Sequence, residues 1–291
     1  MDRPMPRSDE RIRTAFLLNL LFTLIEFAGG FLTNSLSITA DAFHDLGDSF
    51  ALGLAWYFER IAAKGKTPLF SYGYRRFSLI SALINAVILI AGSVLIVTMA
   101  IPRILSPEPV NAEGMILLSI LGILANGAAA YRVHQGKTMN ETMVTWHLLE
   151  DVLGWIGVLV VSIVIMIWDL PVLDPIFSVV LTVFILVNVL RNFRKILIIF
   201  LQGGPPSVTI KGVEEILLRV PGVQGVHDTH LWSLDGEHHI LTTHLVVGKG
   251  CSPEEFRQVK CAAREKALEM GISHATLEME ALGEACEMGE V

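Results

Sequence analysis

The sequence is poor in cysteine and in charged residues, and both shortages narrow the class of protein. Only three cysteines occur among 291 residues, all beyond position 250, and no two form a Cys-x-x-Cys pair. This spacing provides neither a disulfide framework nor a cysteine-rich zinc finger, and it fits a reducing compartment. Charged residues make up 18% of the chain against 52% hydrophobic residues, which is too apolar for an ordinary soluble globule.

Features of ATP-driven proteins and of nucleic-acid-binding proteins are also missing. No glycine-rich phosphate-binding loop occurs, so we expect no ATP-driven step. The formal charge is zero before the glycines and prolines at 203–206 and −7 after them, where six of the nine histidines also lie. An acidic, histidine-rich tail disfavours nucleic acid and suits cations as partners.

The apolar residues gather in blocks, and a bilayer-spanning helix needs about 20 such residues. We predict six spans, at 14–33, 38–58, 77–101, 115–133, 143–168 and 172–189, the last continuing to about 201. Fourteen basic residues fall on one side of this arrangement and only Arg103 on the other. The positive-inside rule therefore predicts that both termini are cytoplasmic.

The segment after the spans has the alternating character of a soluble domain. A helix is predicted at 208–220, strands at 223–234 and 239–247, a second helix from 252 to about 270, and a last strand at 275–281. This order predicts a small open-faced sandwich with its helices on one face of an antiparallel sheet. The predicted organisation is a transmembrane domain at 1–202, a linker at 203–206 and a cytoplasmic domain at 207–291.

Two of the predicted spans contain the same short polar pattern, His44-x-x-x-Asp48 and His147-x-x-x-Asp151. Residues four apart lie on one face of a helix, about one turn from each other. If the two faces meet, they supply two imidazoles and two carboxylates, a tetrahedral set suited to Zn²⁺. Ionisable side chains are costly inside a bilayer, so this repetition predicts an intramembrane metal site.

The ligand types narrow the cation but leave several candidates. Imidazole with carboxylate suits Zn²⁺, Co²⁺, Fe²⁺ or Ni²⁺, whereas an all-oxygen set suits harder cations and thiolates favour Cu⁺. Metal binding requires deprotonated ligands, so exchange of Zn²⁺ for protons is chemically natural.

Other acidic residues in the first two spans have less certain roles. Asp41 lies one turn before His44 and Glu26 is alone in an apolar stretch, so both are candidates for supporting the ligands or for a proton path. Asp45 and Glu150 are rotated by about 100° from the metal-facing direction, and we expect them near water.

Longer motifs around these residues resemble the cation diffusion facilitator family. In the spans they are Glu26-Phe27-x-Gly29-Gly30, Asn34-Ser35-Leu36-Ser37-Ile38-x-Ala40-Asp41-Ala42-x-His44-x-x-x-Asp48, Ser71-Tyr72-Gly73-Tyr74-Arg75-Arg76, Asn85, His147-x-x-x-Asp151-x-x-Gly154 and Asp174-Pro175-x-x-Ser178. In the tail they are Gly222-Val223, Val226-His227-Asp228-x-His230-Leu231-Trp232 and His274-Ala275-Thr276-Leu277-Glu278-Met279-Glu280.

The resemblance covers nearly the whole chain and carries several implications. It implies a homodimeric Zn²⁺/H⁺ antiporter that works by alternating access, with six spans and a ferredoxin-like cytoplasmic domain. The positions that match its transport site are His44, Asp48, His147 and Asp151, and those that match a second, cytoplasmic metal site are His227, His244 and Glu280. Zn²⁺ would then be the transported substrate and, in the cytoplasmic domain, a bound regulatory ion.

Two other functions remain as alternatives for a protein with a metal site in the membrane, a metalloenzyme and a metal sensor. A metalloenzyme would need an open coordination position and a general base, whereas four protein ligands close the shell. A metal sensor would signal through its tail and use the spans only as an anchor. Buried ligands on two separate spans would then have no function. A polar N-terminus unlike a signal peptide, and the lack of a histidine-rich loop between spans four and five, favour a bacterial inner membrane.

Overall fold

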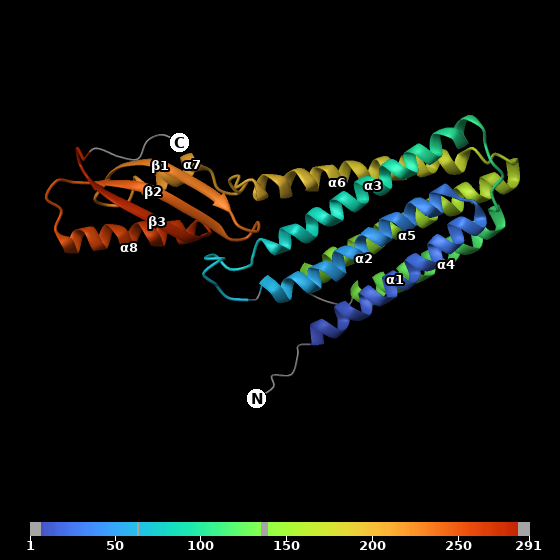
Figure 1. The fold of residues 1–291 in the computed structure, drawn as a ribbon, viewed down its shortest axis with the longest axis horizontal. Helices are drawn as coiled ribbons and strands as arrows, with labels where there is room; N and C mark the ends of the chain where they lie inside the picture. Colours follow the sequence, from blue (N-terminus) through green and yellow to red (C-terminus); the bar gives the residue numbers. More distant parts are fainter. Residues whose placement is uncertain (1–6, 63, 135–138, 285–291) are drawn as a thin grey trace. The chain divides into compact units, whose positions relative to one another are not determined.

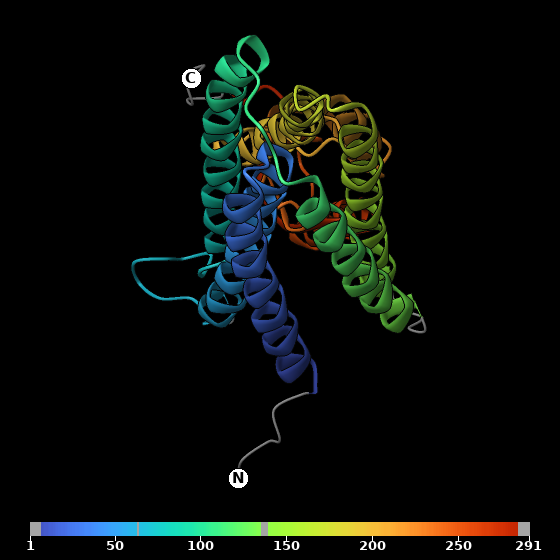
Figure 2. The same ribbon diagram turned by 90° about the vertical axis from the view of Figure 1, so that its right-hand side faces the viewer.

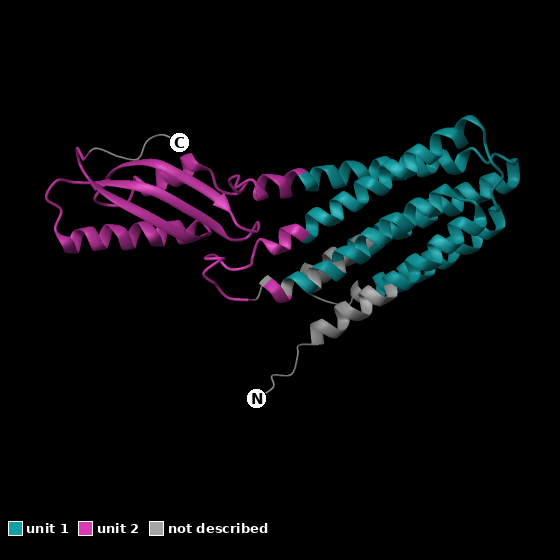
Figure 3. Cartoon of the chain, in the orientation of Figure 1, with its two compact units in different colours: residues 1–58, 81–193 teal, residues 59–80, 194–291 magenta. Residues whose placement is uncertain are grey.

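The computed structural model describes residues 7–62, 64–134 and 139–284, with side chains left undescribed at 7–18, 52, 55, 56, 59, 62, 132–134, 139–144 and 147. The chain divides into two compact units (Figure 3). Unit 1 comprises residues 1–58 and 81–193, and unit 2 comprises residues 59–80 and 194–291. Unit 2 therefore takes in the segment between the second and third predicted spans as well as the tail.

All six apolar blocks are helical. The helices are α1 (Arg7–Thr33), α2 (Leu36–Ala62), α3 (Phe77–Leu105), α4 (Ala112–His134), α5 (Met139–Trp168) and α6 (Leu173–Phe200) (Figure 1). Among the described residues, four helices are long and apolar enough to cross a membrane, namely α3, α4, α5 and α6. Helix α1 has a shorter described apolar segment, Asn19–Thr33, and α2 carries three aspartates within its length.

A buried carboxylate joins the start of α6 to the start of α2. Asp174 is completely buried, and its Oδ1 accepts hydrogen bonds from the hydroxyls of Ser35 at 2.6 Å and Ser37 at 2.5 Å. The backbone N–H groups of Leu36 and Ser37 donate to the same carboxylate, at 2.6 and 3.2 Å. The first N–H groups of a helix have no partner within the helix, and its N-terminus favours negative charge. Asp174 therefore caps α2 from another helix.

Glycines let neighbouring helices in unit 1 approach closely. Helix α1 lies beside α4 in both views (Figures 1 and 2), where a Cβ on Gly29 would come within 2.5 Å of Leu118. A Cβ on Gly122 of α4 would lie 2.3 Å from the ring of Trp155 on α5, which is 1% exposed. Small residues at helix contacts are typical of membrane bundles, where close packing replaces the hydrophobic driving force.

Unit 2 contains a mixed three-stranded sheet with two helices. Its elements are α7 (Ile210–Leu217), β1 (Val223–Ser233), β2 (His239–Val247), α8 (Pro253–Glu269) and β3 (Ile272–Ala281). The strand order is β1-β2-β3, with β1 antiparallel and β3 parallel to β2. The antiparallel sheet predicted from the sequence is therefore wrong for β3. Helix α8 carries the chain back along the sheet, so β3 starts at the same end as β2.

The two faces of this sheet differ in character. Leu241 and Leu245 of β2 are fully buried and belong to one core with Val213 and Leu217 of α7 and Ala263 of α8. Side chains alternate between the faces of a strand, so His244 belongs to the face away from that core.

The segment before α3 contacts the turn between β1 and β2 within unit 2. Nη1 of Arg75 lies 2.7 Å from Nε2 of His238 and 3.9 Å from a carboxylate oxygen of Asp235. Nδ1 of His238 in turn lies 2.8 Å from Asp235. The rings of Tyr72 and His274 also meet edge to face, with centroids 5.7 Å apart.

Replacing Asp174 with alanine should destabilise the protein by about 3 kcal/mol or more, because buried donors on Ser35, Leu36 and Ser37 lose a charged acceptor. Thermal unfolding of the purified protein in detergent measures this loss. Ser178→Ala is the matched control, since the buried Ser178 hydroxyl donates to the Pro175 carbonyl of its own helix and to no other described residue. Equal destabilisation by both variants would contradict a special role for Asp174.

A capping box begins α8, where the Ser252 side chain accepts from the Glu255 N–H and Glu255 accepts from the Ser252 N–H. Ser252→Ala should destabilise α8 by about 1 kcal/mol, read from amide hydrogen exchange in the whole protein. The backbone hydrogen bond from Ser252, with its hydroxyl, lowers the pKa of Glu255. Its stabilisation should therefore be complete above the unfolded-state pKa and be lost as pH falls through the lower folded-state pKa. Protection of α8 that does not change over that acidic range would contradict this contribution.

Candidate metal centres

The polar face of α2 carries two of the predicted intramembrane ligands. Nε2 of His44 lies 3.6 Å from Oδ2 of Asp48, one helical turn further along, and the two side chains are 19% and 20% exposed. A small cavity beside His44 is also lined by Ser93 of α3 and Thr182 of α6. The pair is thus partly accessible, as a site that exchanges ions requires.

Helix α5 carries the other two predicted ligands and meets α2. Asp151 is buried, whereas the side chain of His147 lies outside the described residues. Gly154, one turn after Asp151, faces α2, and a Cβ built on it would be 3.9 Å from Oδ1 of Asp41. The two polar faces therefore point toward each other at the level of Asp41.

The direction of the two helices follows from their ends. Helix α6 begins five residues after α5 ends, and Asp174 in its first turn binds the first residues of α2. The end of α5 therefore lies at the level of the start of α2, and the two helices run in opposite directions. With position 41 opposite position 154, helical geometry brings position 44 opposite 151 and position 48 opposite 147.

Further acidic residues are buried on α1 and α2. Glu26 and Asp45 are almost completely buried, at 1% and 4% exposed, and Asp41 is 8% exposed. Asp45 therefore does not lie near water as expected, whereas Glu150 is exposed. The sequence signal that we missed is the spacing, since Asp45 lies four residues after Asp41 and therefore one turn further along a similar face of α2.

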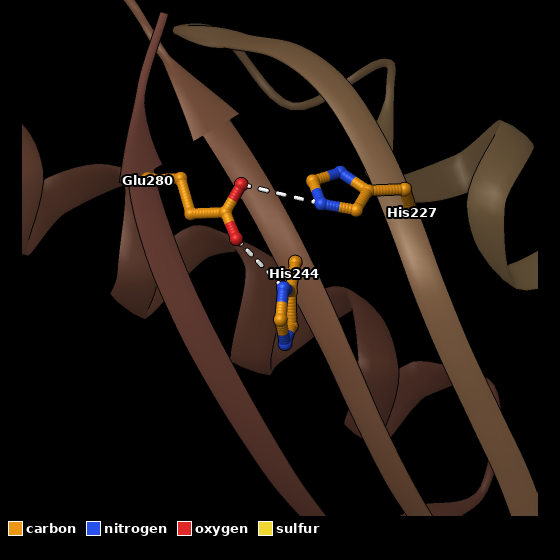
Figure 4. A group of neighbouring side chains, drawn as sticks. All are labelled: His227, His244 and Glu280. Carbon is orange, nitrogen blue, oxygen red and sulfur yellow. Dashed lines mark hydrogen bonds and ion pairs between the residues drawn. The ribbon is translucent and has the colours of Figure 1, made fainter. Parts of the chain in front are cut away.

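A second group of ligands meets on the sheet of unit 2. His227, His244 and Glu280 come from β1, β2 and β3, and one ligand atom from each lies within 4.8 Å of the others (Figure 4). Nδ1 of His244 is 2.7 Å from Oε1 of Glu280, and Nε2 of His227 is 3.2 Å from its Oε2. The side chains of His244 and Glu280 are 5% and 9% exposed, whereas that of His227 is 40% exposed. It is the only such group of three found among the described residues.

Sheet register explains why these three side chains meet. His227 is paired directly with His244, and Glu280 of β3 is paired with Val246, the next residue of β2 on the same face. Side chains two apart on neighbouring strands are within reach of each other. All three ligands therefore stand on the open face of the sheet.

Two acidic residues near this group were not singled out from the sequence. Nε2 of His244 lies 3.4 Å from Asp228 and 3.6 Å from Glu278, and Asp228 in turn is 3.0 Å from His230. Asp228 has a left-handed backbone, with φ of 47°, where the register of β1 shifts. Glu278 could have been found from the sequence, because it lies two residues before Glu280 on the same predicted strand and therefore on the same face of the sheet.

The remaining histidines of the tail lie elsewhere in unit 2. His238 pairs with Asp235, and the ring of His274 meets that of Tyr72 edge to face. His239 is buried beside Ser233, and this burial lowers its pKa.

Two family profiles match the chain. Residues 12–201 match the cation efflux transmembrane domain, and residues 205–281 match the cytoplasmic domain of cation efflux proteins. The zinc transporter ZitB of Yersinia pseudotuberculosis is 32% identical over 278 residues, which cover 94% of this chain and 88% of that protein.

Relatives with other printed substrates match over similar lengths. The cadmium, cobalt and zinc/H(+)-K(+) antiporter of Bacillus velezensis is 30% identical, covering 91% of this chain and 86% of that protein. The metal cation efflux system protein CzcD of Cupriavidus metallidurans is 29% identical, covering 94% of this chain and 88% of that protein. With its four strongly apolar helices and both domains matched, the chain is an integral membrane protein that belongs to the cation efflux family, the cation diffusion facilitators.

Proposed function

We propose that this protein is a secondary transporter that exports divalent transition-metal cations, foremost Zn²⁺, from the cytoplasm in exchange for protons. Membership of the cation efflux family supports metal-cation efflux as the activity. The choice of Zn²⁺ draws on relatives that are named for zinc and on the ligand types in the spans. Membership of a transporter family also argues, indirectly, against an enzyme.

The observation that carries the proposal is the approach of Asp41 on α2 to Gly154 on α5, where an added Cβ would lie 3.9 Å from Oδ1 of Asp41. If the helices run in opposite directions through this approach, His44 comes to the level of Asp151 and Asp48 to the level of His147. Two imidazoles and two carboxylates then surround one ion between the helices, in the tetrahedral coordination that Zn²⁺ favours. Four ligands from two helices can be separated when the helices move, which is what alternating access requires.

Proton exchange follows from the same ligand set. Each imidazole and carboxylate must be deprotonated to hold the metal, so protons leave when the ion binds and return when it departs. Histidine changes its charge near neutral pH, and a proton gradient can therefore drive release of the ion. Glu26 and Asp41 are candidates for supporting the ligands or carrying protons on this path.

The membrane arrangement that we propose has six spans, with both termini in the cytoplasm of a bacterium and the spans in its inner membrane. Residues 1–202 form the transport domain, 203–206 a linker and 207–291 a cytoplasmic ferredoxin-like domain, which also joins two copies into a homodimer. The basic residues on one side and the match of the tail to a cytoplasmic domain support this orientation. ATP and nucleic acid have no part in it.

In the cytoplasmic domain, we propose that His227, His244 and Glu280 bind a regulatory Zn²⁺. The fit is supported by ligand atoms from three strands within 4.8 Å of one another, close enough to share one ion after small rotations. Two imidazoles and a carboxylate leave a fourth position for water or another side chain, a set that zinc accepts. The parallel strand β3 is needed for this set, because it brings Glu280 beside the two histidines.

Asp48→Ala and Asp151→Ala should each lower Zn²⁺ uptake into proteoliposomes under an imposed pH gradient by more than about tenfold, because each removes a ligand of the closed shell. Glu150→Gln is the matched control, since it alters an exposed carboxyl next to Asp151 on the same helix. If the folded wild-type protein binds Zn²⁺ but moves none, it is not a transporter, and a sensor or a metalloenzyme must take its place.

His244→Ala should weaken Zn²⁺ binding at the cytoplasmic site by more than about tenfold, because His244 is the most buried ligand of the three. The measurement is calorimetric titration of the full chain in an Asp48→Ala background, which removes the intramembrane site. His274→Ala serves as the control, since it removes an exposed histidine of the same domain that lies on Tyr72. Equal affinity in the His244 and His274 variants would exclude this site.

A further inference from the structure

A bulge interrupts β1 directly after His227. The register against β2 shifts between His227 and His230. Asp228 and Thr229 therefore lie together opposite one residue of β2, Thr243. Asp228 takes a left-handed backbone conformation at this point, with φ of 47°. Residues other than glycine seldom adopt that conformation, and a bulge of this kind redirects a side chain.

The bulge places Asp228 on the face of the sheet that carries the three proposed zinc ligands. Neighbouring side chains of a regular strand point to opposite faces, so after His227 the next side chain would point toward α7 and α8. Here Thr229 lies on that side, with its hydroxyl 2.8 Å from that of the buried Thr243. The carboxylate of Asp228 lies instead 3.4 Å from Nε2 of His244. Two successive residues of β1 thus reach the same metal-binding group.

The ring of His244 lies between carboxylates on both of its nitrogens. Nδ1 is 2.7 Å from Oε1 of Glu280, and Nε2 is 3.4 Å from Oδ2 of Asp228. The other oxygen of Asp228 is 3.0 Å from Nε2 of His230, and this contact holds the carboxylate in place. Histidines that bind metals commonly donate their second ring N–H to a carboxylate, which fixes the tautomer and the orientation of the ring.

Glu278 is the other carboxylate near Nε2 of His244, at 3.6 Å. Its side chain is 58% exposed, whereas that of Asp228 is 31% exposed. Water screens an exposed carboxylate, and a long side chain loses more conformational freedom when it is held in one place. Asp228 is therefore the better acceptor for His244, because both the bulge and the contact with His230 fix its position.

We propose that Asp228 is a positioning residue of the cytoplasmic metal site, whose carboxylate accepts the Nε2–H of His244 and thereby directs Nδ1 toward the bound Zn²⁺. The inference rests on the proposed Zn²⁺ site and names the residue that orients its most buried ligand. The 3.4 Å separation shortens to a hydrogen bond after a small rotation of the ring or of the carboxylate. Left-handed residues other than glycine cluster at functional sites, which agrees with this role.

The test is calorimetric titration of Zn²⁺ into the full chain in the Asp48→Ala background. Asp228→Gly removes the carboxylate and suits a left-handed backbone, so it should weaken binding by about ten- to a hundredfold while β1 stays folded. Asp228→Asn keeps a weaker acceptor of the same shape and should lose less affinity. Glu278→Gln is the matched control and should change the affinity by less than about threefold.

Two further readouts separate positioning from a purely structural role and from direct ligation. Without metal, both Asp228 variants should unfold at the temperature of the background protein, whereas the stabilisation that Zn²⁺ adds should fall. Co²⁺ bound at saturation should give the same visible absorption spectrum in all three proteins, because its ligands are unchanged. A lower unfolding temperature of both metal-free variants, or a changed spectrum, would overturn the positioning role.

The outcomes distinguish this role from the metal site on which it depends. If His244→Ala leaves the Zn²⁺ affinity unchanged, the cytoplasmic site is wrong, and the positioning role is overturned with it. If His244→Ala weakens binding but Asp228→Gly does not, or if Glu278→Gln weakens it equally, only the role of Asp228 is overturned. None of these measurements depends on Zn²⁺ flux through the membrane domain.

Discussion

The carboxylate of Asp174 is the constraint on which the arrangement of the helices depends. It is completely buried, and it satisfies two hydroxyls and two backbone N–H groups at the start of α2. In a bilayer no water can replace such an acceptor, so the start of α6 and the start of α2 must remain together. The capping also fixes where α2 begins, and thereby the direction of every polar side chain further along it.

Fixing the start of α2 also fixes the directions of the polar side chains one to three turns further along the helix. Asp41 comes to face Gly154 of α5, and Asp45 faces α1. Helix α5 is held in turn by glycine contacts, such as that of Gly122 with Trp155, which leave little freedom to slide. The proposed transport site depends on this arrangement, because two distant four-residue patterns can bind one ion only if α2 and α5 face each other at the same level.

Much of this architecture could be predicted from the sequence, because long apolar blocks and strand alternation are local signals. The six apolar blocks correspond to helices α1 to α6, and β2 begins and ends at the predicted residues. The parallel pairing of β3 was missed because strand direction depends on where α8 returns the chain, which is not a local property. The burial of Asp45 was missed for a similar reason, since it is α1 that covers this face of α2 and the sequence does not say which helices pack together.

The two proposed groups of metal ligands differ in what holds them in place. Strand register positions His227, His244 and Glu280, so the backbone hydrogen bonds of the sheet keep their ligand atoms close without an ion. The side chain of His227 is 40% exposed, which leaves the group accessible to a metal ion from solvent. The buried carboxyl groups of α1 and α2 have no such ladder, and their positions depend on how the helices pack. Sheet geometry therefore suits the proposed cytoplasmic site, which needs ligand atoms at fixed distances, whereas ligands on separate helices suit the proposed transport site, whose ion has to arrive and depart.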